Sequence, residues 1–200
     1  MSEHTTSGAR PRREREVLDA AVEAFARHGF AGASVQDVAD SVGILKGSLY
    51  HYIRSKDELL FRLLSEIHDD VERILEEVRD VPDLSPLQRL SLYVERQVVW
   101  NLANLARISI YYHDVRHLAG EQRQTIFARR KLHERFVADL VVDAQRAGEA
   151  DADLDPELAA YCVFSTIIWT YRWARPDHMD PADLARTCAL FATTSLLPAR

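Results

Sequence analysis

The chain has 200 residues, of which 47% are hydrophobic and 28% are charged, and its formal net charge at pH 7 is −6. This length allows one large domain, or a small domain joined to a larger one. The two cysteines, Cys162 and Cys188, lack metal-site spacing, and we expect buried free thiols rather than a disulfide framework. The polar N-terminus contains no secretory signal, and the longest apolar stretch, 158–173, is short for a membrane span, so we expect a cytoplasmic protein with no membrane partner.

The charge is unevenly distributed along the chain. Residues 1–56 contain eight Lys or Arg and seven Asp or Glu, whereas residues 57–200 contain seventeen and twenty-four. Because an acidic surface repels DNA, any contact with DNA should be confined to the N-terminal part. Two interpretations of its densest basic cluster stay open: a solvated, disordered tail, or an arm that follows phosphates or the minor groove. This cluster is Arg10, Arg12, Arg13 and Arg15.

Apolar residues recur with helical spacing along almost the whole chain, and no strand alternation persists, which predicts an all-α fold. A first helix, with Phe25 on its apolar face, should end at Gly29. In the segment SVQDVADSV, Ser34 and Asp37 form a short capping box for a second helix. Gly43 follows that helix, where a left-handed residue is favourable.

A third helix is expected from Leu45 to Tyr52, and it is too short to be stable without neighbours. Residues 55–58 (SKDE) form an S-x-x-E box that opens a long fourth helix. Two helices around a glycine turn, followed by a third helix start, are the layout of a helix-turn-helix, whose second helix enters the DNA major groove. The fourth helix carries a regular apolar stripe of Leu60, Leu64, Ile67, Val71, Ile74 and Val78.

The segment GILKGSLYHYIRSKDELL, together with SVQDVADSV and AAVEAFARHGFAGAS, resembles the DNA-binding domain of the TetR family of transcriptional repressors. The resemblance covers residues 10–60 and implies a dimeric regulator that binds double-stranded DNA at a palindromic operator. Many family members carry Ser or Thr where this chain has Leu45, at the cap of the recognition helix. Leucine cannot accept a backbone hydrogen bond, so this cap should be missing or replaced.

Residues near the start of a recognition helix reach base edges, so Lys46 and Ser48 are candidate base contacts, and Gly47 would allow close backbone approach. We expect Leu49 and Tyr52 to lie in the core, and partial core packing is an open alternative for Tyr50. In the TetR family the matching positions commonly contact DNA. The phosphate contacts predicted here come from Arg12, Ser34, Gln36, Tyr50, His51 and Lys56.

Five further helices are predicted over 86–103, 105–118, 121–147, 156–174 and 181–196, three of them opened by Ser-Pro or Asp-Pro. The last two helices carry apolar stripes that either complete the core of the monomer or pair with their copies in a second subunit. The family resemblance favours the homodimer. The stripes are Leu158, Cys162, Ser165 and Trp169, and Leu184, Cys188, Phe191 and Ser195.

Polar groups interrupt these apolar faces. Arg130 and His133 share a helix face with apolar residues, which predicts that both point inward, where a buried arginine requires a partner or an anion. Tryptophan rings interleaved with guanidinium groups suit a purine ring and phosphates. The predicted effector contacts are Tyr111, Tyr112, Arg130, His133, Trp169, Arg172, Trp173 and Arg175.

The segments IYYHDVRHLAGEQRQTIFARRKLHERF and TYRWARP are similar to TetR-family regulators of lipid or steroid breakdown that respond to acyl-coenzyme A thioesters. This resemblance implies an apolar tunnel for an acyl or ring moiety, with Arg172 and Arg175 near the coenzyme phosphates. The alternative is that Arg130, Arg172 and Arg175 form salt bridges with the abundant acids.

A weaker pattern allows an enzyme. His113 and His117 lie in HDVRH, which resembles H-E-x-x-H with Asp in place of the catalytic Glu and without an evident third ligand. We expect solvated or hydrogen-bonded histidines, and a small helical metal-dependent hydrolase is the alternative function. The chain contains no nucleophile elbow, P-loop or dinucleotide fingerprint, so we predict neither catalysis nor a cofactor.

The predicted organisation is a helix-turn-helix domain over residues 1–54 and a ligand-binding and dimerisation domain over residues 55–200. The predicted function is a dimeric transcriptional repressor that a small-molecule effector releases from its operator. The family implies that effector binding moves the fourth helix and changes the separation of the two recognition helices.

Overall fold

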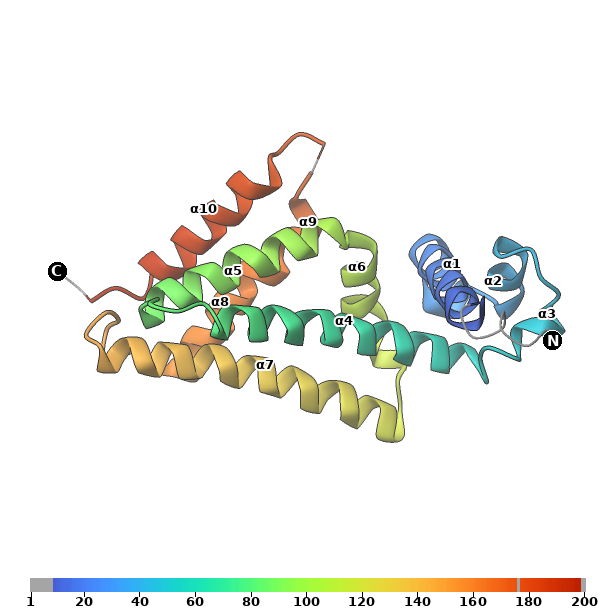
Figure 1. Cartoon of the computed structure of the whole chain (residues 1–200), viewed down its shortest axis with the longest axis horizontal. Helices are drawn as coiled ribbons and strands as arrows, with labels where there is room; N and C mark the ends of the chain where they lie inside the picture. The colour runs from blue at the N-terminus through green and yellow to red at the C-terminus, as the bar shows by residue number, and fades with distance from the viewer. Residues whose placement is uncertain (1–8, 176, 199–200) are drawn as a thin grey trace, which may run out of the picture. The chain divides into compact units, whose positions relative to one another are not determined.

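A computed structural model describes residues 9–175 and 177–198, so Pro176 of the TYRWARP segment lies outside the described residues. All regular structure in these residues is helical, which confirms the predicted fold class. The elements are α1 (Ala9–Gly32), α2 (Val35–Ser41), α3 (Lys46–Leu49), α4 (Lys56–Arg79), α5 (Pro86–Ala103), α6 (Leu105–Asp114), the 3₁₀ helix η1 (Val115–His117), α7 (Gly120–Arg146), α8 (Pro156–Ile168), α9 (Thr170–Trp173) and α10 (Pro181–Thr194) (Figure 1).

Helix starts follow the predicted capping signals. The Ser34 hydroxyl accepts a hydrogen bond from the Asp37 amide at 3.2 Å, and the Asp37 carboxylate accepts one from the Ser34 amide at 2.7 Å. Ser85 caps α5, while Asp155 and Asp180 cap α8 and α10. Each cap satisfies amides that have no partner inside the helix, so these local signals determine where the helices begin.

Two glycines end helices by adopting left-handed backbone conformations. Gly29 has a φ of +69° and interrupts α1, so the first regular helix ends where the sequence predicts. Gly43 has a φ of +66° directly after α2. A side chain is disfavoured in this conformation, and the turn between α2 and α3 therefore depends on glycine.

Three predicted helices are shorter than expected. The predicted helix 105–118 ends at Asp114 and continues as η1, and the predicted helix 156–174 divides at Trp169 into α8 and α9. At that division the Thr170 hydroxyl donates to the Ile167 carbonyl at 2.7 Å, a bond that competes with the regular helix pattern. The third predicted helix, expected over 45–52, is α-helical only over Lys46–Leu49 and is followed by turns with i to i+3 bonds.

The chain forms two compact units. Unit 1 comprises Met1–Ile67 with Ala106–Thr125, and unit 2 comprises His68–Leu105 with Ile126–Arg200. Helix α4 contributes residues to both units. The division into a helix-turn-helix domain over residues 1–54 and a ligand-binding and dimerisation domain over residues 55–200 stays a prediction.

Unit 1 includes α6 because specific polar contacts hold it there. The Asp114 carboxylate accepts a hydrogen bond from the Phe30 amide at 3.3 Å in the interior. Glu66 accepts from Arg15 of α1 at 3.1 Å and from Arg107 of α6 at 2.9 Å. The apolar core of the unit includes Leu18, Phe25, Val38, Ala39, Leu49, Leu60 and Leu64, all buried.

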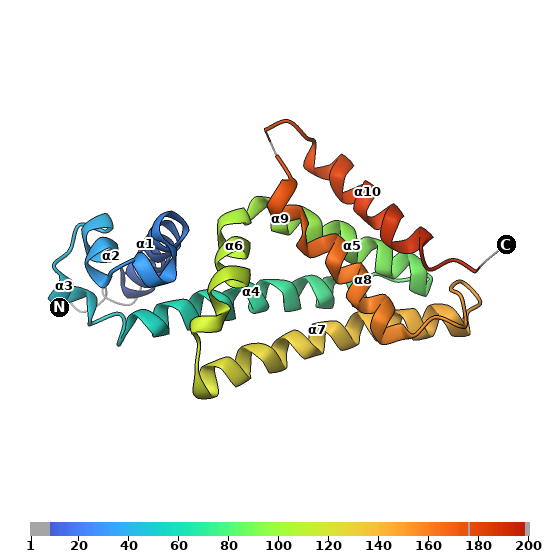
Figure 2. The ribbon, with the colours of Figure 1, turned by 180° about the vertical axis from the view of Figure 1, so that it is seen from behind.

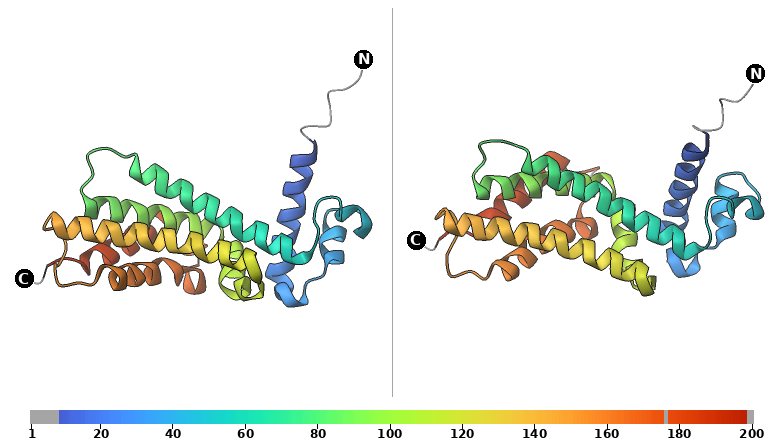
Figure 3. Two further views of the ribbon diagram at one scale, coloured as in Figure 1. Left: turned by 90° about the horizontal axis from the view of Figure 1, so that it is seen from below. Right: turned by 60° about the horizontal axis from the view of Figure 1, so that its bottom comes forward.

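Unit 2 is a helical bundle with one apolar core. Helices α5 and α7 run beside the part of α4 that belongs to this unit (Figures 1 and 3). Helix α10 packs along α5, and α8 contacts both α5 and α10 (Figure 2). The predicted α4 stripe, from Leu60 to Val78, is buried throughout.

None of the described helices is both long enough and apolar enough to cross a membrane.

Candidate functional site

Helix α3 combines a buried anchor with an exposed polar row. Leu49 is fully buried, as predicted, and Ile53 is buried one turn later. Lys46, Gly47, Tyr50 and His51 are exposed, while Ser48 is partly exposed. Tyr50 is exposed, which contradicts the alternative that it packs in the core. Tyr52, which was expected in the core, is only half-buried. The anchor therefore leaves the predicted DNA-contacting side chains accessible.

The cap of α3 lacks a side-chain hydrogen bond, as the leucine at this position predicts. Leu45 is the N-cap residue, and its side chain is 79% exposed. Its carbonyl accepts hydrogen bonds from the amides of Ser48 at 2.9 Å and Leu49 at 3.2 Å. The backbone at the start of α3 is thus held without any contribution from the leucine side chain.

Ser34 and Gln36 lie exposed at the start of α2 and already interact with carboxylates. Backbone and side-chain hydrogen bonds from Ser34 lower the pKa of Asp37, which keeps that carboxylate ionised. Gln36 donates to Asp40 at 2.6 Å. The Ser34 hydroxyl accepts one bond in the cap and retains its own proton for a further acceptor, so its predicted phosphate contact remains geometrically available.

Lys56 has a structural position that the sequence analysis missed. Its ammonium group donates to the Phe30 carbonyl at 2.7 Å and to the Ala33 carbonyl at 2.9 Å. It also lies 4.4 Å from the centroid of the Phe30 ring. The side chain is partly buried and satisfies carbonyls after the interruption of α1, so its ammonium is engaged within unit 1 rather than extended toward phosphates.

The N-terminal arginines are helical from residue 9 onward, which contradicts the interpretation of Arg10–Arg15 as a disordered tail. Arg12 is exposed and pairs with Glu16 at 3.1 Å, one helical turn away. Arg13 also pairs with Glu16, at 2.7 Å. Exposed pairs of this kind are weak, so Arg12 can exchange its carboxylate for a phosphate. Its predicted DNA contact would come from a helix and not from an extended arm.

In unit 2, the Trp-Arg segment lies on the surface. Trp169, Arg172, Trp173 and Arg175 are all exposed, and the Arg172 guanidinium lies 5.9 Å from the centroid of the Trp169 ring. Neither Arg172 nor Arg175 forms an ion pair with an acid within residues 9–175 and 177–198. The salt-bridge alternative therefore does not account for these two arginines.

Arg130 and His133 differ in burial, although both were expected to point inward from the same helix face. Arg130 is exposed and pairs with Glu134 at 2.9 Å, so the prediction that it points inward is wrong. The salt-bridge alternative does describe Arg130. His133 is buried as predicted, and its Nε2 atom has no hydrogen-bond partner among the described residues.

The inward arginine of α7 is Arg129, which the sequence analysis missed. It donates to Glu72 at 2.7 Å with two nitrogens and to Asp69 at 2.6 Å. Hydrogen bonds from Arg129 lower the pKa of Glu72. Burial lowers the pKa of His68 to about 3 and that of His133 to about 4, so both histidines are neutral at pH 7.

Tyr111 and Tyr112 belong to unit 1, whereas the other six predicted effector residues belong to unit 2. Tyr111 is buried, and the two tyrosine rings meet edge to face with centroids 5.0 Å apart. Neither unit by itself therefore brings together all eight residues.

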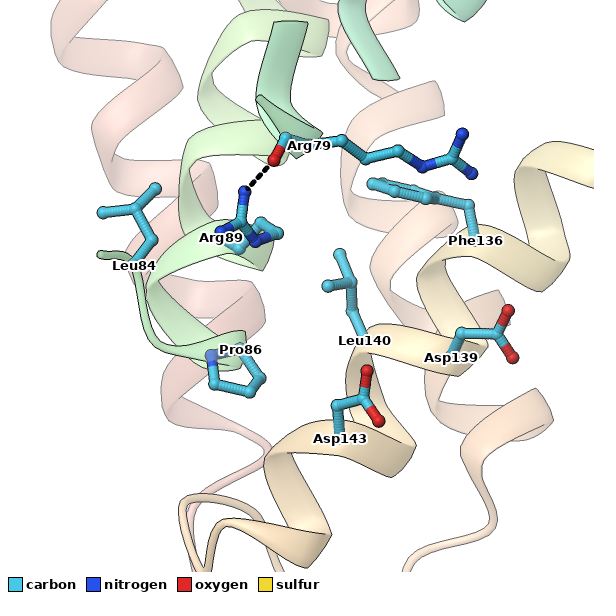
Figure 4. A pocket seen from close by; sticks show the side chains of 8 residues that line it. All are labelled: Arg79, Leu84, Pro86, Arg89, Phe136, Asp139, Leu140 and Asp143. Atoms are coloured by element: carbon cyan, nitrogen blue, oxygen red, sulfur yellow. Dashed lines mark hydrogen bonds between the residues drawn. The ribbon is translucent and has the colours of Figure 1, made fainter. Parts of the chain in front are cut away.

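Unit 2 also contains a pocket of about 290 Å³ that the sequence analysis did not predict (Figure 4). Arg79 extends over the Phe136 ring at 4.9 Å from its centroid, while Asp139 and Asp143 lie on the α7 side. The Arg89 guanidinium donates to the carbonyls of Val78, Arg79 and Val81 at the end of α4. These bonds within the protein occupy the Arg89 guanidinium, and the pocket lies between the end of α4, the start of α5 and α7.

Two larger pockets of unit 2 also lack the predicted effector residues. A pocket of about 610 Å³ lies between α7 and α8 and includes Lys131, Arg135 and Tyr161. A pocket of about 570 Å³ lies between α4 and α5 and includes Trp100. None of these three pockets is lined by any of the predicted effector contacts.

The histidines of HDVRH do not share a regular helix face, because α6 ends at Asp114 and His117 lies in η1. The His113 ring makes a hydrogen bond with Ser109 at 3.2 Å, and the His117 ring lies 5.0 Å from the Phe30 ring. Within the described ranges, no group of three or more His, Cys, Asp or Glu is arranged to hold a metal ion.

The geometry of unit 1 agrees with comparisons to known proteins. Residues 17–63 match the family model for bacterial regulatory proteins of the tetR family, and residues 83–196 match the tetracyclin repressor-like C-terminal domain. The chain belongs to the TetR family of bacterial regulators. It is therefore a DNA-binding regulator with an N-terminal helix-turn-helix, and not an enzyme.

Several characterised proteins are similar over most of the chain. The transcriptional repressor KstR2 of Rhodococcus jostii is 33% identical over 86% of this chain and 83% of its own. The structure of the ketosteroid regulator KstR2 of Mycobacterium tuberculosis matches with a TM-score of 0.86 and 25% identity over 98% of both chains. AibR in complex with isovaleryl coenzyme A and operator DNA matches with a TM-score of 0.82 and 26% identity, over 94% of this chain and 100% of that one.

Proposed function

We propose that this protein is a homodimeric transcriptional repressor that binds a palindromic operator and is released from it by an acyl-coenzyme A thioester. The observation that carries the DNA-binding part is the exposed polar row of α3, held by the buried Leu49. A short helix anchored on one face and polar on the other suits insertion into the major groove. A regulator of chromosomal DNA would act in the cytoplasm.

Within this proposal, Lys46 donates to guanine O6 and N7, and Ser48 bonds to a base edge. Gly47 has open space around its Cα, which permits close approach to the DNA backbone. Phosphates are contacted by Arg12, Ser34, Gln36, Tyr50 and His51. Lys56 supports the domain through the Phe30 and Ala33 carbonyls instead of contacting DNA.

The proposed dimer is supported by the apolar surfaces of the last long helices. Exposed leucine and aromatic surface is unfavourable in water, and contiguous exposure of this kind commonly marks a protein interface. Cys162 was expected to be buried, but it is exposed on α8, which a dimer interface would explain. Pairing of α8 and α10 with their copies would form a four-helix interface with two-fold symmetry. The exposed residues are Leu158, Tyr161, Cys162, Trp169, Leu190 and Phe191.

The proposed effector class is supported by chemistry on this chain and by its relatives. The exposed Arg172 and Arg175 have no acidic partner among the described residues, and Trp169 and Trp173 offer rings for a purine. In unit 2, the buried Gln97 Oε1 and His133 Nε2 atoms lack hydrogen-bond partners among those residues. An acyl or ring moiety that carries a hydroxyl would supply such partners, because a hydroxyl both donates and accepts, and buried polar groups are normally hydrogen-bonded. The isovaleryl coenzyme A of the AibR complex motivates the choice of a thioester.

Release requires that the effector binds two states of the protein with unequal affinity. Helix α4 is suited to transmit a change between the two units, because it belongs to both. Lys56 lies in its unit 1 part and His68 in its unit 2 part. A shift of α4 would move the Lys56 ammonium and the carbonyls to which it bonds.

The test has two stages. Selection from random DNA duplexes, at low salt and without effector, is expected to enrich an inverted repeat whose half-sites are about 34–36 Å apart or a multiple of this distance. The complex is then titrated with coenzyme A, acetyl-coenzyme A, isovaleryl-coenzyme A and a long-chain acyl thioester. Release by a thioester at a lower concentration than free coenzyme A supports the effector class. Failure of all thioesters to bind or release would reject the effector and leave DNA binding intact, whereas enrichment of no inverted repeat would reject operator binding.

A further inference from the structure

Leu45 presents an apolar side chain at the start of the helix that is proposed to enter DNA. Its side chain is 79% exposed, although its carbonyl is held by the amides of Ser48 and Leu49. Leu49 is fully buried, so the backbone beneath Leu45 is anchored in unit 1. The neighbouring Lys46 is also exposed, which gives this end of the helix one apolar and one cationic side chain.

Leucine carries two energetic costs at this position. A Ser, Thr, Asn or Asp at the N-cap would accept a hydrogen bond from an otherwise unpaired amide, and Leu45 accepts none with its side chain. The exposed side chain also forgoes the stabilisation that burial of its apolar surface would supply. Single exposed leucines are common, but here both costs coincide at a residue beside the proposed base contact Lys46.

The base edges of the major groove offer one apolar group, the C5-methyl group of thymine. We infer that Leu45 contacts the C5-methyl group of a thymine in each operator half-site, close to the base pair contacted by Lys46. Contact with this methyl would bury the leucine surface that is exposed in the free protein. This inference rests on the proposed DNA binding by α3, and it adds a specificity for T·A pairs to it.

Replacement of thymine by uracil removes this methyl group and keeps Watson–Crick pairing, so it tests the contact directly. Each thymine of the enriched operator is replaced in turn in both half-sites, and Kd is measured by fluorescence anisotropy. At one position per half-site, uracil is expected to weaken binding of the wild-type protein by roughly four-fold per methyl group. Other thymines of the operator should tolerate the replacement.

Three variants identify the residue responsible. Leu45→Ala is expected to bind the thymine and uracil operators with equal affinity. Leu45→Ser should also lose the discrimination, yet it should melt about 2–4 °C higher because serine can cap α3. Lys46→Ala is the matched control, since it should bind more weakly but keep its uracil sensitivity. Circular dichroism of each variant checks that the helices are intact.

The outcomes separate this inference from the proposed function. If the wild-type protein binds its operator and no uracil replacement weakens it, Leu45 makes no methyl contact and the inference is overturned. The same holds if Leu45→Ala retains the full uracil penalty, because another residue then contacts the methyl group. If no inverted repeat is enriched at all, operator recognition itself is rejected, and the methyl contact with it.

Discussion

His68 of α4 and His133 of α7 face each other inside unit 2, with ring centroids 5.0 Å apart. Glu72 and Arg129 lie beside them, and the His133 Nε2 atom is 3.7 Å from the Glu72 carboxylate. Burial holds the pKa of both histidines far below the ordinary value of 6.5, which means that this interface tolerates the imidazole and not the imidazolium form. Glu72 raises the pKa of both histidines but does not outweigh burial, and the positive charge of Arg129 lowers both pKa values further.

Acid should therefore destabilise the protein through this pair. Unfolding raises each pKa to about 6.5, so the unfolded state binds protons first as the pH falls. The stabilisation is fully present above pH 6.5 and is lost as the pH falls from 6.5 toward 4, at up to about 1.4 kcal/mol per pH unit for each histidine. Urea unfolding at fixed protomer concentration measures this slope. His133→Gln should reduce it between pH 6.5 and 5, and a slope equal to that of the wild-type protein would contradict this account.

Lys56→Met should destabilise the protein and leave the salt dependence of DNA binding unchanged. The two carbonyl bonds to Phe30 and Ala33 are lost, which should cost about 1–3 kcal/mol of unfolding free energy. Loss of a phosphate contact would instead lower the slope of log K against log salt by about one. Chemical denaturation and anisotropy titrations at several salt concentrations distinguish the two. A lower slope with unchanged stability would restore Lys56 to the DNA interface.

Lys46→Ala should weaken specific binding by roughly 1–3 kcal/mol and relax selection at one base pair of each half-site. The reason is that a lysine at the start of α3 supplies donors to guanine, and alanine supplies none. Affinities for the selected operator and for its single-base variants measure both effects. Lys131→Ala, an exposed lysine of α7, is the matched control. Unchanged operator affinity in Lys46→Ala would reject the proposed base contact.

Phe191→Asp should convert a dimer into a folded monomer. Phe191 of α10 is 73% exposed, so the fold of the monomer does not need it, but a carboxylate in the proposed four-helix interface would be desolvated without a partner. Sedimentation equilibrium should give the monomer mass, and operator affinity should fall because the two half-sites are no longer bound together. Leu132→Asp alters an exposed leucine of α7, outside the proposed interface, and should remain dimeric. A dimeric Phe191→Asp protein would exclude this surface as the interface.

Arg172→Ala and Arg175→Ala should weaken thioester binding by about 1–3 kcal/mol each, since each guanidinium is proposed to pair with a coenzyme phosphate. Calorimetry with the thioester that releases the operator measures the loss. Arg146→Ala removes another exposed arginine, which pairs with Asp143, and should leave the affinity unchanged. Wild-type affinity in both Arg172→Ala and Arg175→Ala would place the coenzyme elsewhere.

Local signals were enough to predict most helix starts. Ser34 with Asp37, and proline after Ser85, Asp155 and Asp180, act within one turn, so their effect is readable from adjacent residues. The buried stripe of α4 was predictable for the same reason, because its spacing recurs over about five turns.

Side-chain partners on other helices were not predictable in this way. Arg129 and Arg130 are adjacent at the edge of the buried α7 face, and their difference depends on Glu72 and Asp69 of α4, about sixty residues earlier. Lys56 likewise bonds to carbonyls more than twenty residues before it. Periodicity predicts which side of a helix is apolar. It does not identify the polar group on another helix that pairs with a residue at the edge of that apolar side.

The bond from the Phe30 amide to Asp114 has a consequence for protein synthesis. When the ribosome has made the chain only as far as Ile67, this buried amide still lacks its partner Asp114, and Glu66 still lacks its partner Arg107 on α6. An amide left unpaired in the interior costs about 1–3 kcal/mol, a large share of the stability of a small helical domain. The nascent DNA-binding segment should thus gain its full rigidity only after α6 has emerged from the ribosome, so DNA binding should begin only after more than half of the chain has been made.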